Sequence, residues 1–286
     1  MPSKISHSLI DQFAAGPSAS RASAVKSLQE NLRTALEIWA GEGNFETFLQ
    51  GSYRNGTAIA DINDVDIVAL YTPWKSPATD ADWNRIFTKI AGVLKQTSLV
   101  TGTVETGDKC VTLTTSTLKA DIVPALRKGL LTSSDPIAVY SRRESGERPN
   151  YPRVHYQNGV AKQRATKDAY KPTVRLFKRW ARQYPGLKAP SFYIECAVHS
   201  VADTHFDSYL PASFLQVGIE ICGYTRTKVI NSVAGDKDIL VPSEWDPDDF
   251  ETFTTALLPD LRRVLNAVQA RTEPEANRHW RAAFGA

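Results

Sequence analysis

The stretch FLQGSYRNGTAIADINDVDIVALY, Phe48 to Tyr71, decides how this 286-residue chain folds. Its first residues close a short apolar run that indicates a strand, and Gly51 and Ser52 then open a turn-rich loop. The loop leads to VDIVALY, Val65 to Tyr71, whose apolar side chains predict a buried strand. The stretch therefore predicts a strand, a glycine-containing turn and a second strand.

Acidic residues accompany these strands. Asp64 and Asp66 open the second strand, and side chains two residues apart in a strand point to the same face. Asp121 lies inside a further apolar strand, LKADIVPAL, where an unpaired carboxylate is costly; taken alone, it could pair with Lys119 or Arg127. Close carboxylates repel one another unless a cation shares them, and hard oxygen ligands favour Mg²⁺. We therefore predict that the three aspartates are catalytic and metal-binding.

The loop between the first two strands suits phosphate groups. A glycine lets the backbone approach a phosphate closely, and hydroxyl groups add hydrogen-bond donors. Gly51, Ser52 and Thr57 supply these features, and Gln50 precedes the glycine. We assign these four residues to a nucleotide-binding loop.

The remaining patterns predict a mixed α/β (α+β) protein of two lobes. Helices are expected at residues 18–40, 80–96, 167–184, 191–201 and 249–271, and further strands at 45–49, 110–116 and 118–126. Strand signals become rare after residue 126. We therefore expect a catalytic sheet lobe at 1–126 and a helical lobe at 127–286, with the first helix spanning the back of both and the active site in the cleft.

Composition excludes several classes of protein. The chain is 42% hydrophobic and 23% charged, which is ordinary for a globular protein. No apolar run reaches the roughly 18 residues of a membrane span, and the first residues lack the apolar core of a signal peptide. Three cysteines without close spacing argue against a disulfide framework or a cysteine zinc site. We expect a cytoplasmic protein that does not associate with membranes.

Positive charge is concentrated in one part of the chain. Residues 141–190 contain 13 basic and 3 acidic residues, although the whole chain carries a net charge of only +3. Within the helix expected at 167–184, the helical spacing forms a cationic stripe of Lys171, Arg175, Lys178 and Arg182. Ser191 follows Pro190 at a helix start, where backbone donors favour phosphate. These features predict an anion-binding surface; the alternative is a solvated helix face.

The motifs together resemble a known superfamily. GSYRNGT, followed by DVD and a later strand aspartate, resembles the DNA polymerase β-like nucleotidyltransferases. The whole chain is most similar to the bacterial cGAS/DncV-like nucleotidyltransferases (CD-NTases). Within that family, the residues of its motifs are similar to those of clade E. In the carboxyl-terminal half, the stretches YPRVHYQNGVAKQRATKDAYKPTVRLFKRW, APSFYIECAV and WDPDDF carry the resemblance.

The resemblance implies two-metal nucleotidyl transfer. Two Mg²⁺ ions, for which Mn²⁺ can substitute, would be held by Asp64, Asp66 and Asp121. Lys178 and Ser191 match the family positions that contact the donor triphosphate, and Lys171 belongs to the same cationic stripe.

Asn158 is the candidate for base selection. In clade E an asparagine at this place favours pyrimidines, and an amide can both donate to and accept from the edge of uracil. The alternative is that Asn158 and Gly159 form a turn, because Asn-Gly is a strong turn signal.

The resemblance implies that the chain condenses nucleoside triphosphates, with ATP and UTP expected, into a cyclic di- or oligonucleotide that contains a pyrimidine. The product would be cyclic UMP–AMP or cyclic di-UMP, and it would activate a separate effector protein in bacterial anti-phage defence. We expect a monomer that does not take nucleic acid as a substrate. The alternatives are a cyclic purine dinucleotide synthase, a linear oligonucleotide or other nucleotidyltransferase of the same fold, and an inactive nucleotide- or RNA-sensing module.

Overall fold

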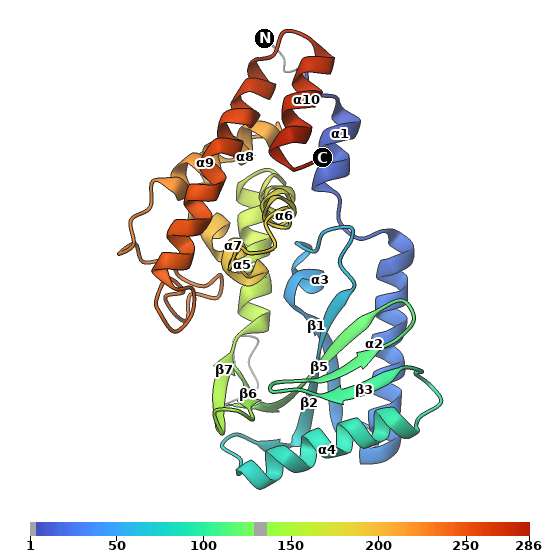
Figure 1. Ribbon diagram of the computed structural model, residues 1–286. Coiled ribbons are helices and arrows are strands. Elements are labelled where there is room, and N and C mark those ends of the chain that lie inside the picture. The colour runs from blue at the N-terminus through green and yellow to red at the C-terminus, as the bar shows by residue number, and fades with distance from the viewer. Residues whose placement is uncertain (1–3, 129–135) are drawn as a thin grey trace. The chain divides into compact units, whose positions relative to one another are not determined.

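The computed structural model describes residues 4–128 and 136–286, which form two compact units (Figure 1). The sheet unit comprises Pro17–Asn55 and Asp61–Val154. The helical unit comprises Met1–Gly16, Gly56–Ala60 and His155–Ala286. The five residues Gly56–Ala60 are therefore part of the helical unit, although they lie between two strands of the sheet unit in the sequence.

The strands of the described residues form one mixed sheet. Their bounds are β1 Phe45–Gln50, β2 Asp64–Lys75, β3 Thr103–Thr106, β4 Val111–Thr114, β5 Lys119–Arg127, β6 Ile137–Ser141 and β7 Gly146–Asn150. The order is β1-β2-β5-β4-β3, with β6 paired to β5 and β7 paired to β6. β2 and β5 run parallel, and the other pairs are antiparallel.

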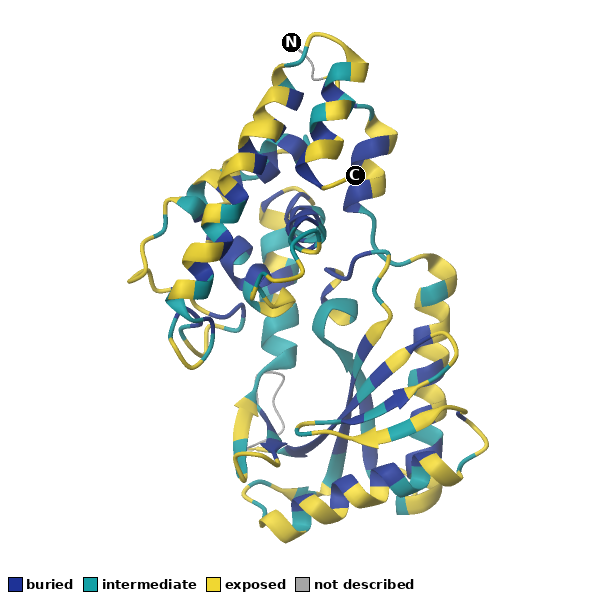
Figure 2. Ribbon diagram, in the orientation of Figure 1, coloured by how far each residue is buried: buried dark blue, intermediate teal, exposed yellow. Residues whose placement is uncertain are grey.

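Two helices pack on one face of this sheet. α2 (Ala19–Ala40) begins after the Ser18 side chain, which accepts a hydrogen bond from the amide of Arg21. α4 (Asp80–Gln96) begins with a complete capping box formed by Thr79 and Asp82. The apolar faces of both helices pack against alternate residues of β2 and β5, and this side of the sheet is the core of the unit (Figure 2).

The alternation of β2 decides where its aspartates point. Val65, Ile67 and Ala69 belong to the core shared with α2 and α4, whereas Val68 and Leu70 belong to a small cluster on the other face. Since side chains alternate along a strand, the residues at 64 and 66 lie on the face opposite α2 and α4.

The helical unit is built around aromatic side chains. Its helices are α1 His7–Ala14, α5 from Pro152 to Ala165, α6 Tyr170–Ala181, α7 Ser191–Ser200, α8 Leu210–Cys222, α9 Pro247–Gln269 and α10 Glu273–Ala283, with a 3₁₀ turn η1 at Asp203–His205. The boundary with the sheet unit falls inside α5. Among the fully buried side chains are Trp180, Trp245, Trp280, Phe177 and Phe214.

The mixed α/β class and most of the expected elements are confirmed. The helix expected at 80–96 has these bounds, and the one expected at 18–40 begins one residue later, after its cap. The apolar run at 65–71 lies inside β2. Long amphipathic helices and apolar strands carry periodic patterns that local reasoning can detect.

The expected boundary between the two lobes, after residue 126, differs from the observed division of the chain. The sheet continues through β6 and β7 to Asn150, and residues 56–60 and 1–16 belong to the helical unit. α2 lies wholly within the sheet unit, so the expectation that the first long helix spans both lobes is wrong; a separate helix, α1, precedes it. β6 and β7 are five residues each, and β7 has the polar sequence GERPN, which gives little apolar alternation.

In the part of the chain that the structure describes, there is no helix with both the length and the apolar character that a membrane crossing requires.

Candidate active site

Gly51 makes a turn that only glycine suits. It follows β1 directly and opens the single-turn helix α3 (Gly51–Asn55) with φ +62°. A Cβ atom at this position would collide with the Asp66 carboxylate. The backbone of the turn therefore lies against the acidic side chain, and this proximity supports the assignment of Gly51 to the site.

Two of the predicted catalytic carboxylates are brought together by parallel strand pairing. Asp66 of β2 lies directly opposite Asp121 of β5 in the register. Asp64 lies opposite Lys119, and its Oδ1 is 3.9 Å from the Lys119 Nζ in a solvent-exposed ion pair. The alternative partner considered for Asp121, Lys119, is thus directed to Asp64.

The electrostatics of this end of the sheet are unfavourable to negative charge. Burial raises the pKa of Asp66 to about 6, and the neighbouring charges of Asp121 and Asp64 add to the increase. Asp121 is held by Thr112 of β4, whose hydroxyl donates a 2.6 Å hydrogen bond to Asp121 Oδ1. A bound cation would relieve the repulsion between the carboxylates.

The donor chemistry fits a divalent cation, although the described residues contain no ready-made cluster of three or more His, Cys, Asp or Glu ligands. Asp66 and Asp121 provide adjacent hard oxygen donors on one face of the sheet, as Mg²⁺ prefers. Asp64 is exposed and paired with Lys119, so it would have to leave that pair to join them.

The other predicted residues of the sheet unit surround the glycine turn. Gln50 ends β1, and its Oε1 accepts a 3.2 Å hydrogen bond from Asn150 Nδ2 of β7. Ser52 lies in α3 and is partly exposed. The nucleotide-binding roles of both remain predictions.

Thr57 and Lys178 lie in the helical unit and are fully engaged there. Lys178 is 5% exposed, and its Nζ is 2.7 Å from Glu195 Oε2 and 3.0 Å from Thr57 Oγ1. The Thr57 hydroxyl also donates a 2.7 Å hydrogen bond to Glu195 Oε2. Both side chains are thus buried in protein contacts in this structure, and their nucleotide-binding roles remain predictions.

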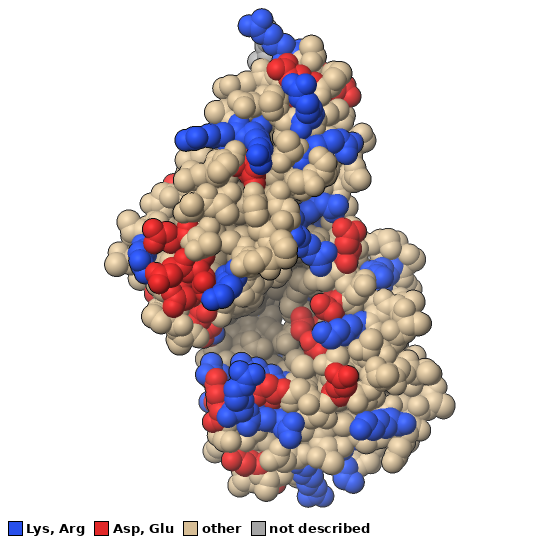
Figure 3. Space-filling model, viewed as in Figure 1, with Lys and Arg blue, Asp and Glu red and all other residues tan. Residues whose placement is uncertain are grey.

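Much of the basic segment is neutralised or used internally. Arg175 donates hydrogen bonds to the carbonyls of Ala14 and Gly56, and burial lowers the pKa of this arginine. Arg182, at the end of the same stripe, is exposed. Other members of the segment form ion pairs, and on the visible face the Lys and Arg side chains are interspersed with Asp and Glu (Figure 3). Two members of the expected stripe, Arg175 and Lys178, therefore contact protein groups in this structure, and anion binding by the stripe remains a prediction.

Two further predicted residues stand at helix starts. Ser191 is the first residue of α7 and is exposed, next to backbone amides that a helix start leaves available. Lys171 is in the first turn of α6; its backbone amide donates to Gln163 Oε1, and its ammonium lies 5.8 Å from the centre of the Tyr156 ring.

Asn158 lies within α5, so the alternative of an Asn-Gly turn is wrong. Its Nδ2 donates a 2.8 Å hydrogen bond to the carbonyl of Val233. Gly159 is buried in the same helix, and a Cβ atom at this position would meet no heavy atom within 4 Å. Base selection by Asn158 remains a prediction.

Sequence reasoning missed Thr112, His155 and Glu195. Glu195 lies in the apolar run SFYIECAV and could have been found by the signal that identified Asp121, an acid flanked by apolar residues. Thr112 is an ordinary strand residue, and only the pairing of β4 with β5 brings its hydroxyl to Asp121.

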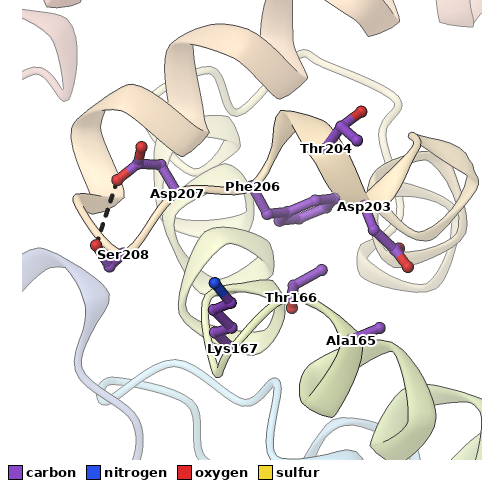
Figure 4. A pocket seen from close by; sticks show the side chains of 8 residues that line it. All are labelled: Ala165, Thr166, Lys167, Asp203, Thr204, Phe206, Asp207 and Ser208. Atoms are coloured by element: carbon purple, nitrogen blue, oxygen red, sulfur yellow. Dashed lines mark hydrogen bonds between the residues drawn. The ribbon is translucent and has the colours of Figure 1, made fainter.

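A pocket of about 440 Å³ lies elsewhere in the helical unit, between the end of α5 and the segment after η1 (Figure 4). It is lined by Ala165, Thr166, Lys167, Asp203, Thr204, Phe206, Asp207 and Ser208, and it contains none of the predicted site residues.

The chain is similar to nucleotide synthases of known family. Residues 157–262 match the cGAS/DncV-like nucleotidyltransferase C-terminal helical domain. A cyclic UMP–AMP synthase of Rhodothermus marinus is 31% identical over 220 residues, which cover 67% of this chain and 76% of the relative. A cyclic dipurine nucleotide synthase of Elizabethkingia meningoseptica is 30% identical over 190 residues, which cover 56% of this chain and 65% of the relative.

The structural comparison covers more of the chain. The solved structure of the Rhodothermus marinus CdnE c-UMP-AMP synthase with Apcpp and Upnpp superposes with a TM-score of 0.71 at 26% identity. The match covers 89% of this chain and 97% of that structure.

Proposed function

The chain belongs to the CdnE-like cGAS/DncV-like nucleotidyltransferases and is a nucleotidyltransferase, and we propose that it condenses nucleoside triphosphates into a cyclic oligonucleotide. The named relatives make cyclic nucleotides, with products that include cyclic UMP–AMP and cyclic dipurines.

The observation that carries the proposal is the pairing of Asp66 with Asp121 beside the glycine turn. Their like charges and the burial of Asp66 give the end of the sheet a strong preference for positive charge. Mg²⁺ held by these carboxylates and Asp64 would supply the charge neutralisation and hydroxyl activation of two-metal nucleotidyl transfer.

The protein residues then have the following parts in the reaction. Gly51 and Ser52 receive phosphate oxygens at the turn, and Thr112 keeps the Asp121 carboxylate oriented. The acceptor ribose hydroxyl releases its proton to water as its oxygen bonds to the α-phosphorus of the donor. The bond between that phosphorus and the bridging oxygen breaks, and pyrophosphate leaves. A second such transfer between the two ends closes the ring.

We further propose that one of the joined nucleotides is a uridine. Support comes from the cyclic UMP–AMP synthase among the relatives and from Asn158, an amide that α5 holds partly exposed. The product is proposed to act on a separate effector in bacterial anti-phage signalling, with the enzyme working as a cytoplasmic monomer.

The test is product analysis after incubation with each labelled nucleoside triphosphate and with all mixtures, in Mg²⁺ and separately in Mn²⁺. We expect a phosphatase-resistant product that contains uridine, identified by mass spectrometry. Asp64→Ala combined with Asp66→Ala should give no product with the fold retained, whereas the exposed Asp11→Ala should behave as wild type. A linear, phosphatase-sensitive product would refute cyclisation, and a purine-only product would refute the role of Asn158.

A further inference from the structure

Four polar side chains form one row across the sheet. Gln50 of β1 pairs with Asp66 of β2, and Asp66 pairs with Asp121 of β5. Thr112 of β4 pairs with Asp121 from the other side. Residues directly opposite one another in paired strands have their side chains on the same face of a sheet. Gln50 therefore lies at the β1 end of the carboxylate row, as Thr112 lies at its β4 end.

The alternation of β1 agrees with this placement of Gln50. Leu49 packs against the core shared with α2 and α4, whereas Phe48 packs against the small cluster on the opposite face. Because side chains alternate along a strand, Gln50 shares the face of Phe48, which is also the face of the aspartates. The next residue, Gly51, lies against the Asp66 carboxylate. The Gln50 carboxamide is thus a neighbour of that carboxylate.

The chain at the end of β7 runs along the same face of β1. Asn150, the last residue of β7, donates a 3.2 Å hydrogen bond from Nδ2 to Gln50 Oε1. Arg153, three residues later, forms a 2.6 Å ion pair with Glu46, and its guanidinium lies 5.4 Å from the centre of the Phe48 ring. Positions 46, 48 and 50 follow one another on this face. The hydrogen bond of Asn150 is therefore one of three contacts along β1, all within the sheet unit.

The hydrogen bond from Asn150 fixes which end of the Gln50 carboxamide is available. A carboxamide carries an oxygen that accepts and an NH₂ group that donates, on opposite sides of one carbon. Asn150 engages Gln50 Oε1, and among residues 4–128 and 136–286 no group accepts a hydrogen bond from Gln50 Nε2. The free end is thus a donor. Beside the carboxylate of Asp66 a donor is electrostatically favourable, whereas a further acceptor oxygen would be repelled.

We propose that Asn150 is a positioning residue, whose hydrogen bond keeps the Gln50 carboxamide turned so that Nε2 donates to an oxygen of the nucleotide bound over the carboxylate row. The proposal rests on the proposed nucleotidyltransferase reaction. Asn150 acts only through Gln50 and touches no nucleotide. A donor that meets an ionised phosphate forms a charge-assisted hydrogen bond, which is stronger than a neutral one.

The test uses Asn150→Asp, which keeps the shape of the side chain and replaces its donor by an acceptor. The new carboxylate attracts the Gln50 NH₂ group, so the carboxamide should turn over and present its oxygen to the row. Asn44→Asp is the matched control. Asn44 is also partly exposed in the sheet unit and also donates through Nδ2, but to the Ala40 carbonyl at the end of α2.

Nucleotide affinity is the first measurement. Dissociation constants are determined by isothermal titration calorimetry in Mg²⁺, with analogues of ATP and UTP that have a non-hydrolysable α,β bridge. For Asn150→Asp we expect the affinity for at least one analogue to fall about tenfold, because a hydrogen bond to a charged group is lost. Asn44→Asp should bind both analogues as wild type does. Equal losses in the two variants, or unchanged affinity in Asn150→Asp, would overturn the proposal.

A second background separates the orientation of the amide from the effect of the added charge. Gln50→Leu removes the carboxamide and should itself weaken binding about tenfold. In that background Asn150→Asp should weaken binding less than about twofold further, because no amide remains to be oriented. The same loss in both backgrounds would show that the new charge acts on the nucleotide directly, which contradicts the proposal.

Side-chain NMR keeps this proposal separate from the proposed function. The NH₂ resonances of Gln50 are assigned by their absence in Gln50→Leu. In Asn150→Asp these protons should exchange with water at least about threefold more slowly, since the turned NH₂ group is bonded to the new carboxylate. Unchanged exchange refutes the positioning role. If wild-type protein binds no nucleotide, the proposed function fails, and the exchange result still decides whether Asn150 orients Gln50.

A second substitution covers the case in which Asn150→Asp does not fold. Asn150→Ala only removes the donor, so the carboxamide is free to turn, and the affinity should fall about threefold in wild type. With Gln50→Leu already present, Asn150→Ala should have no further effect. A loss that is equal with and without the Gln50 carboxamide would overturn the proposal.

Discussion

Two carboxylates of this protein, the partly buried Asp66 in the sheet unit and the buried Glu195 in the helical unit, have opposite electrostatics. Around Asp66 burial and two further aspartates raise the pKa to about 6. Around Glu195 burial alone would raise the pKa, but Lys178 and His155 outweigh it and lower the pKa, and the Thr57 hydroxyl donates a hydrogen bond to the carboxylate.

The difference separates a site for binding from a site for stability. Carboxylates that repel one another in the protein alone are stabilised when a cation binds. A network whose charges are already paired is not stabilised further in this way. The end of the sheet with unneutralised carboxylates is therefore the candidate active site, whereas the network around Glu195 stabilises the helical unit.

The largest effect on stability is expected at Glu195. Glu195→Ala leaves the buried Lys178 ammonium without its carboxylate, so we expect the free energy of unfolding to fall by about 3–5 kcal/mol. Urea denaturation followed by circular dichroism measures the change. The matched control is Glu144→Ala, which removes an exposed pair with Arg148 and should cost less than about 1 kcal/mol. Equal losses in the two variants would show that the buried pair contributes no more than a surface pair.

Asp66 should respond in the opposite direction. At pH 7.5, above its raised pKa, the side chain is charged at a cost to the native state, so Asp66→Asn should stabilise the metal-free protein by up to about 3 kcal/mol. Thermal unfolding in EDTA measures this gain, with the exposed Asp11→Asn as the neutral control. Added Mg²⁺ should raise Tm for wild type but much less for Asp66→Asn. A destabilised Asp66→Asn protein would contradict the electrostatic account of the site.

The smallest expected effect concerns the orientation of Asp121. Thr112→Val removes the hydroxyl that donates to Asp121 Oδ1, an interaction of about 1.5 kcal/mol, so the rate of product formation should fall by about tenfold. Thr114→Val, two residues along the same strand and exposed, is the control. Initial rates at saturating nucleotide measure the difference, and identical rates in the two variants would show that Thr112 does not orient the carboxylate.

Much of the sheet unit was predictable from the sequence. The apolar alternation of β2 and β5 and the helical periodicity of α2 and α4 are local signals, and Asp64, Asp66 and Asp121 stood out because acids are unusual in such strands. The glycine turn was equally legible, since Gly51 follows an apolar run that indicates a strand and opens a turn-rich loop.

The helical unit was less predictable for physical reasons. The helical spacing of the cations in α6 predicted an anion-binding surface. Charge spacing along one helix does not show which partners other helices bring to these side chains. Glu195 of α7 and the carbonyl of Gly56 turned Lys178 and Arg175 inward. The interior of α5 was hidden by its polar composition and by an Asn-Gly pair that usually signals a turn.

The sequence by itself determined the mixed α/β class, the positions of the strand aspartates and the glycine turn, because each depends on residues near one another in the chain. Tertiary structure alone decided that Asp66 faces Asp121, that Thr112 holds Asp121, and that Thr57 belongs to the helical unit. These contacts join residues from 9 to 138 positions apart, and no local periodicity encodes which strand or helix a side chain will meet.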